Sequence, residues 1–219
     1  MKLFSTKIGI YLVVGVFTIM GCKQFNKREK TSSVAVLPYY NDPSFTPNWF
    51  EPDDNGLKGF HSTPDFLLVN QLGDTISGKT FDDKIYVTNF FFTSCPGICP
   101  KMAENITVLQ KEFKNDDSVL LLSHSVTPEM DSVPVLQNYA DINGVLATGQ
   151  GKQVYDLGRD AYFVEEDLGI AKSEDDFLHT ENFVLIDKDK YIRGIYNGLN
   201  KTAIVQLIAD IETLKLEDL

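Results

Sequence analysis

The chain has 219 residues, 43% of them hydrophobic, which is enough for one domain with a substantial core together with a targeting segment. It carries 20 Lys and Arg against 31 Asp and Glu, a net charge of −11, and this acidity argues against a nucleic-acid-binding protein. With only three cysteines and three histidines, thiol and imidazole chemistry is confined to a few positions.

Residues 1–21 have the pattern of a lipoprotein-type signal peptide. Lys2 and Lys7 precede an apolar stretch that is short for a membrane-spanning helix. The stretch ends in Met-Gly-Cys, which resembles a bacterial lipobox, so Cys22 is predicted to carry the lipid anchor. A plain signal peptide and an uncleaved N-terminal anchor are the alternatives, and all three place the rest of the chain outside the cytoplasm.

Residues 22–60 are predicted to form a tether followed by an irregular lead-in arm. The tether is polar, whereas the arm from residue 34 onwards contains four prolines and many aromatic residues. So many aromatic side chains are unusual in a free linker, and we expect the arm to pack on the surface of the domain. The domain itself is predicted at residues 61–219, and His61 at its start is expected to be solvated.

A buried strand is predicted over residues 84–92, and the cysteine pair follows it directly. Gly97 and two prolines form a turn after Cys95, and a helical pattern covers residues 100–114. Both thiols therefore lie at a strand-to-helix junction. The partial positive charge of the helix N-terminus is expected to favour the thiolate form of Cys99.

The rest of the domain alternates strands and helices. Strands are predicted at 65–70 and 118–125 with a short apolar piece at 145–148, helices at 132–139, 152–158 and 202–214, and a hairpin at 182–187 and 191–196. Two central strands joined through a helix imply a parallel pair, and the hairpin adds antiparallel strands. The predicted fold is α/β, a thioredoxin-like mixed central sheet flanked by helices.

The cysteine pair favours redox or metal chemistry over a structural role. If Cys22 is lipidated, Cys95 and Cys99 are the only remaining thiols, in a compartment where disulfides can form. A disulfide between cysteines so close in sequence closes a very small loop and constrains the unfolded chain little. Thiolates are soft ligands of the kind that select Cu(I).

Several segments together resemble the Sco/SenC copper chaperones. Residues 91–102 match the Phe-x-Thr-x-Cys-Pro-x-x-Cys-Pro-x-Met signature of that family. Residues 125–131 resemble its Ser-Val-Asp-Pro-Glu-x-Asp segment, with Thr127 where the family usually has Asp. His179 stands where the family has a histidine before a late strand, whereas ordinary thioredoxins keep a proline in that approach.

The resemblance implies a copper site formed by Cys95, Cys99 and His179, with one copper ion per chain as Cu(I) or Cu(II). Two thiolates suit Cu(I), and the nitrogen donor helps to hold Cu(II). A fourth Cys or His ligand would favour tetrahedral zinc, and the local sequence offers neither. His124, at the end of a buried run, is expected to pack in the core.

The resemblance also implies a membrane-tethered metallochaperone in the bacterial cell envelope. Its cargo would be delivered to the binuclear copper centre of cytochrome c oxidase, so the copper-bearing subunit of that oxidase is an expected partner. A thiol reductant outside the cytoplasm is another, because an oxidised pair binds no metal. The alternatives are an extracytoplasmic thiol–disulfide oxidoreductase, with Cys95 and Cys99 as its redox pair, and a redox or copper sensor.

Overall fold

The computed structural model describes residues 32–50, 55–143, 146–167 and 177–217, which belong to one compact unit. The predicted signal peptide and Cys22 lie outside the described residues. Among the residues that are described, no helix is both long enough and apolar enough to cross a membrane.

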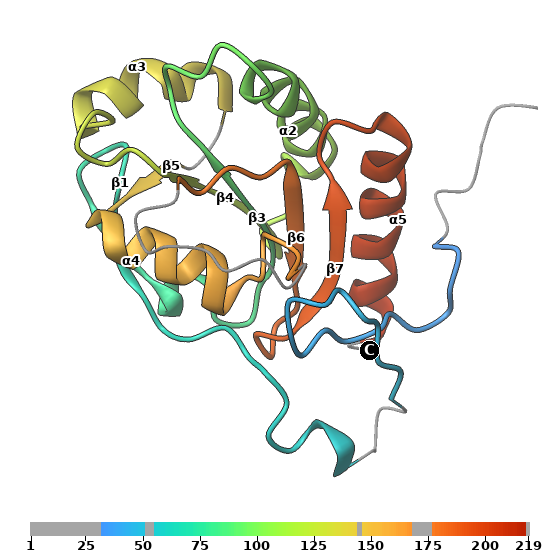
Figure 1. Ribbon diagram of the computed structural model, residues 1–219. Coiled ribbons are helices and arrows are strands. Elements are labelled where there is room, and N and C mark those ends of the chain that lie inside the picture. The colour runs from blue at the N-terminus through green and yellow to red at the C-terminus, as the bar shows by residue number, and fades with distance from the viewer. Residues whose placement is uncertain (1–31, 51–54, 144–145, 168–176, 218–219) are drawn as a thin grey trace, which may run out of the picture. The chain divides into compact units, whose positions relative to one another are not determined.

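A seven-stranded sheet with the order β2-β1-β5-β4-β3-β6-β7 forms the centre of this unit (Figure 1). The strands are β1 Leu67–Asn70, β2 Thr75–Ser77, β3 Ile85–Phe91, β4 Val119–Ser125, β5 Leu146–Thr148, β6 Asn182–Ile186 and β7 Ile192–Asn197. β3, β4 and β5 run parallel, whereas β1 pairs antiparallel with β5, and β6 pairs antiparallel with both β3 and β7. This confirms the predicted mixed, thioredoxin-like α/β fold.

Helices cover both faces of the sheet (Figure 1). They are α2 Cys99–Phe113, α3 Val133–Asn143, α4 Gly151–Asp156 and α5 Lys201–Glu217, with a π-helical turn, η3 Leu157–Ala161, directly after α4 and 3₁₀ turns at η1 Asn55–Leu57 and η2 Gly78–Phe81. Apolar side chains of α2 and α5 share one hydrophobic cluster. Side chains of α4 and η3 belong to a second cluster on the other face.

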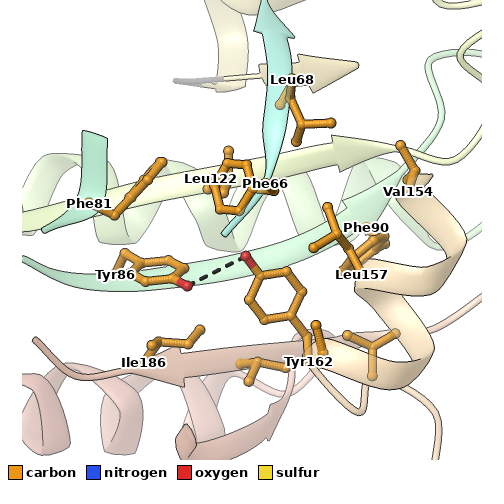
Figure 2. Close-up of a cluster of buried hydrophobic side chains, with 14 of the residues drawn as sticks. Phe66, Leu68, Phe81, Tyr86, Phe90, Leu122, Val154, Leu157, Tyr162 and Ile186 are labelled. Carbon is orange, nitrogen blue, oxygen red and sulfur yellow. Dashed lines mark hydrogen bonds between the residues drawn. The ribbon is translucent and has the colours of Figure 1, made fainter. Parts of the chain in front are cut away.

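The central strand β3 is buried along its whole length, as its continuous apolar run predicts. Successive side chains point to opposite faces, so Tyr86 and Phe90 enter the cluster below α4 and η3, and Val87 enters the cluster of α2 and α5. Figure 2 shows the cluster of α4 and η3, in which Tyr86 and Tyr162 are joined by a hydrogen bond of 3.4 Å between their hydroxyl oxygens.

The described residues of the lead-in arm pack on the domain. Leu37 is only 2% exposed. The backbone N–H of Tyr40 donates to the carbonyl of Ile192 in β7 at 3.0 Å, so the arm is bridged to the edge strand at one residue.

Arg193 in β7 fastens the arm from inside the domain. Its guanidinium donates to the carbonyls of Leu37 and Pro38 and lies 3.9 Å from the centre of the Tyr39 ring. The same side chain forms an ion pair of 2.7 Å with Glu217 at the end of α5. One buried cation therefore joins the arm, the sheet and the last helix.

Candidate metal centre

The two cysteines lie where β3 ends and α2 begins. After the strand the chain turns, with the N–H of Cys95 donating to the carbonyl of Phe92 at 3.2 Å, and Cys99 opens the helix. Pro100 follows in the first helical turn, where its missing N–H costs no hydrogen bond. Both residues are buried, at 9% exposure for Cys95 and 5% for Cys99, and both are free thiols.

The two thiols are hydrogen-bonded to each other and differ in acidity. Burial would raise the pKa of Cys95, but hydrogen bonds from the Cys99 thiol and from backbone N–H groups of residues 97–99 outweigh burial and lower that pKa below its ordinary value. Burial, followed by the hydrogen bond and charge of Cys95, raises the pKa of Cys99 to about 12. The expectation that the helix N-terminus favours the Cys99 thiolate is therefore wrong, because burial and the neighbouring sulfur outweigh the helix dipole.

A buried carboxylate holds the chain just before the cysteines. Asp131 is 1% exposed and accepts hydrogen bonds from the backbone N–H of Thr93 at 3.2 Å and from the Thr93 hydroxyl. It also accepts from the hydroxyls of Ser125 at 2.6 Å and Thr127 at 3.0 Å. Thr127 thus serves as a donor to Asp131, and the carboxylate joins the cysteine loop to the end of β4.

Asp131 closes the segment that resembles the family, and the sequence suggested it only as a cap of the following helix, not as an acceptor for the cysteine loop. The sequence contains both partners, the 125–131 segment and the threonine at position 93 before the cysteines. In the structure, both belong to the hydrogen-bond network around Asp131. The contact between them is long-range, and no local pattern reveals it.

His179 lies on an irregular segment just before β6. The ring of Phe177 meets the ring of Phe92 edge-on, with 5.3 Å between centroids, and this contact joins the histidine segment to the cysteine loop. A small cavity is lined by His179 and Cys99 together, with Phe92 and Leu178 among the other walls. Cys99 also lines a second small cavity on its other side, with Tyr139.

The structure therefore brings the two predicted thiol ligands together and places the predicted imidazole ligand on the same cavity as one of them. In the part of the chain that is described, no group of three or more His, Cys, Asp or Glu side chains is already close enough to hold a metal ion. Two thiols and an imidazole fit a soft metal ion by their donor chemistry. The three-residue ligand set stays a prediction.

The other two histidines lie away from this site. His124 is fully buried and its ring stacks on Phe90 at 4.7 Å between centroids, as expected for a packed residue. Neither of its ring nitrogens has a hydrogen-bond partner, and burial lowers its pKa to about 3. His61 is half-buried instead of solvated, because its Nε2 lies 2.8 Å from the carbonyl oxygen of Ala161 and its ring packs on Phe163.

Comparison with known proteins gives one consistent result. The family model described as SCO1/SenC matches residues 55–215. A SCO1 protein homolog of Bacillus subtilis is 28% identical over 158 residues, covering 68% of this chain and 80% of the relative.

Solved structures of similar proteins agree with the family match. A SCO1/SenC family lipoprotein from Bacillus anthracis superposes with a TM-score of 0.61 at 27% identity, covering 71% of this chain and 95% of the other. BsSco is described as having a disulfide switch and as a member of the Sco family of cytochrome c oxidase assembly proteins. Its structure superposes with a TM-score of 0.57 at 26% identity, covering 70% of this chain and 93% of the other. The copper-bound ScoI of Arabidopsis thaliana shares the fold, with a TM-score of 0.55 at 22% identity, covering 72% and 99%.

Proposed function

The chain belongs to the SCO1/SenC family, and from that premise we propose that it is a membrane-tethered copper metallochaperone. Its copper ligands are Cys95, Cys99 and His179, with one ion per chain. The cargo goes to the binuclear copper centre of cytochrome c oxidase in the bacterial cell envelope, through contact with the copper-bearing subunit.

One observation carries this proposal: Cys99, one thiol of a hydrogen-bonded pair of free thiols, lines a cavity together with the imidazole of His179. Cys99 and His179 line that cavity although they are far apart in the sequence. The ring contact between Phe92 and Phe177 joins the two segments that carry them. Movement of the imidazole toward the thiols would bring the three proposed ligand groups to one ion. The copper-bound relative supports the identity of the ion.

The membrane tether is the other part of the proposal. Cys22 after the apolar N-terminal stretch supplies a lipid attachment point, and the similar protein from Bacillus anthracis is described as a lipoprotein. Outside the cytoplasm the thiol pair oxidises readily. A thiol reductant in the same compartment therefore keeps the pair reduced, which metal binding requires.

Copper binding is tested on the full chain carrying Cys22→Ser, which leaves Cys95 and Cys99 as the only thiols. The reduced protein in detergent is loaded with copper, and metal per chain and affinity are measured by elemental analysis and chelator competition. About one copper per chain is expected. Cys95→Ser or Cys99→Ser should abolish tight binding, and His179→Ala should weaken it while leaving dithiol exchange intact.

His61→Gln is the matched control, because it removes an imidazole outside the site and keeps a donor for the Ala161 carbonyl. It should bind copper like the parent. Unchanged affinity in His179→Ala would remove that residue from the ligand set. Thiol–disulfide exchange without tight copper binding would replace the chaperone by the oxidoreductase. Delivery is tested by mixing the loaded protein with the metal-free copper-bearing subunit and measuring copper in each after separation.

A further inference from the structure

His179 is carried by residues 177–180, which we call the histidine strap. The residues on either side of His179 are buried, with Leu178 at 1% and Thr180 at 6% exposure, whereas His179 itself is exposed. An exposed side chain between two buried neighbours takes its position from their anchors. The placement of the imidazole therefore depends on what holds Leu178 and Thr180.

Leu178 packs directly against Gly158 in the π-helical turn η3. A Cβ atom at position 158 would lie 2.5 Å from Cδ2 of Leu178 and 3.2 Å from Cε1 of Phe90. Carbon atoms do not pack at 2.5 Å, so any side chain at this position would displace Leu178 or Phe90. Figure 2 shows how Leu157, the first residue of the turn, and Phe90 fill the same part of the core.

Thr180 is anchored to the chain that leaves the same turn. Its hydroxyl donates to the carbonyl of Val164 at 2.6 Å, and the side-chain amide of Asn182 donates to that carbonyl at 2.9 Å. The N–H of Val164 in turn donates to the carbonyl of Gly158 at 3.0 Å. Both anchors of the strap therefore lead back to Gly158, and π-helical turns frequently occur at functional sites.

We propose that Gly158 is a positioning residue for His179. The missing side chain lets Leu178 enter the core, and this sets the strap so that the imidazole lines the cavity shared with Cys99. Gly158 acts through Leu178 and does not itself bind the ion. The inference rests on the copper site proposed above and extends it to a residue that carries no ligand atom.

The test is Gly158→Ala in the full chain carrying Cys22→Ser. Copper affinity should fall about 10- to 100-fold, as is typical when the support of a metal ligand is removed. The spectrum of the Cu(II) form should shift toward that of His179→Ala, because the nitrogen ligand is misplaced. The reduction potential of the Cys95–Cys99 pair should stay unchanged, since the strap carries no thiol.

Gly151→Ala is the matched control in the neighbouring helix α4. A Cβ there would make one tight contact, 3.0 Å to Oε1 of Glu129, which is the end of a side chain that can move aside, and an ordinary contact of 3.9 Å to Cγ of Pro128. This variant should bind copper like the parent. The double variant Gly158→Ala/Leu178→Val tests the mechanism, because the shorter side chain makes room for the added methyl group and should restore most of the affinity.

Thr180→Val tests the second anchor of the strap without changing the space that Leu178 occupies. If Gly158→Ala does not fold, this variant tests whether the anchors of the strap position His179. It keeps the shape of the side chain but removes the hydroxyl that bonds to Val164, and it too should weaken copper binding. Parent-like affinity in Gly158→Ala or Thr180→Val, a failed rescue by Leu178→Val, or a changed reduction potential would overturn the inference. If His179→Ala binds copper with the affinity of the parent, His179 is not a copper ligand, and both the proposed copper site and this inference are wrong.

Discussion

The two thiols of the site have different surroundings although they are hydrogen-bonded to each other. Cys95 lies in a turn whose backbone N–H groups point at its sulfur, and these contacts lower its pKa against the effect of burial. Cys99 sits deeper, between two small cavities, and burial raises its pKa to about 12. At neutral pH the pair therefore has one acidic thiol and one that stays protonated. In the proposed copper site, metal binding must drive the loss of the second proton.

This difference predicts the order of chemical modification. In the reduced, metal-free protein carrying Cys22→Ser, limiting iodoacetamide at pH 7 should alkylate Cys95 first, because the thiolate is the nucleophile. Peptide mass spectrometry of the singly modified protein locates the label. Raising the pH should narrow the preference as Cys99 begins to ionise. Equal labelling of both thiols at pH 7, or labelling of Cys99 first, would contradict the assignment.

At the scale of the elements, the cysteine loop is held by the segment between β4 and α3. Asp131, just before α3, accepts hydrogen bonds from the loop through Thr93 and from the end of β4 through Ser125. Four donors converge on one buried carboxylate, and each loses its partner if the carboxylate is removed.

Asp131→Ala should therefore lower the free energy of unfolding by about 3 kcal/mol, because several buried donors are left unsatisfied. Urea denaturation of the reduced, metal-free protein measures this loss. Asp131→Asn should cost less, since it keeps the shape and part of the acceptor capacity. The control is Asp117→Ala at an exposed position in the turn before β4, which should change stability by less than about 0.5 kcal/mol. A loss equally small in Asp131→Ala would show that the loop is held by other contacts.

The elements differ in how far the sequence could predict them. β3, β4, α2 and α5 follow from continuous apolar runs or helical spacing, and their positions agree with the sequence to within a few residues. β2 was not predicted, because a strand of three residues exists only through its pairing with β1. The π-helical turn η3 was missed for a related reason: its form depends on how it packs against Phe90 and Leu178.

The candidate site shows the same division. Cys95, Cys99 and His179 were chosen from spacing and family resemblance, whereas Asp131 and Gly158 act through contacts with residues distant in the sequence. The acidity of Cys99 was predicted wrongly because the helix N-terminus is visible in the sequence and the depth of burial is not.

For the whole molecule, the pH dependence of stability depends on the fully buried imidazole of His124. It is stacked on Phe90, and neither nitrogen has a partner, so the folded state keeps it neutral. Its pKa falls from 6.5 to about 3 through burial. Between these two values the unfolded chain binds a proton that the folded chain does not, so stability decreases as the pH falls.

The loss should reach about 1.4 kcal/mol per pH unit well below pH 6.5. Asp187 acts in the opposite direction, because burial raises its pKa to about 6 and the folded state gains stability by taking up its proton between that value and 3.8. The two effects are separated by comparing the parent with His124→Leu, in which Asp187 is unchanged. Urea denaturation from pH 7.5 to 4.5 should show the variant increasingly more stable than the parent below pH 6.5. Parallel pH curves would contradict a neutral buried imidazole.

The backbone contact between Tyr40 and β7 bears on self-association. The arm bridges the edge strand β7 at Ile192, and β2 at the opposite edge is only three residues long. A short edge strand, or one bridged by its own chain, offers few free backbone groups for pairing with a strand of another molecule. If Cys22 carries the proposed lipid anchor, many copies crowded on one bilayer would each stay monomeric.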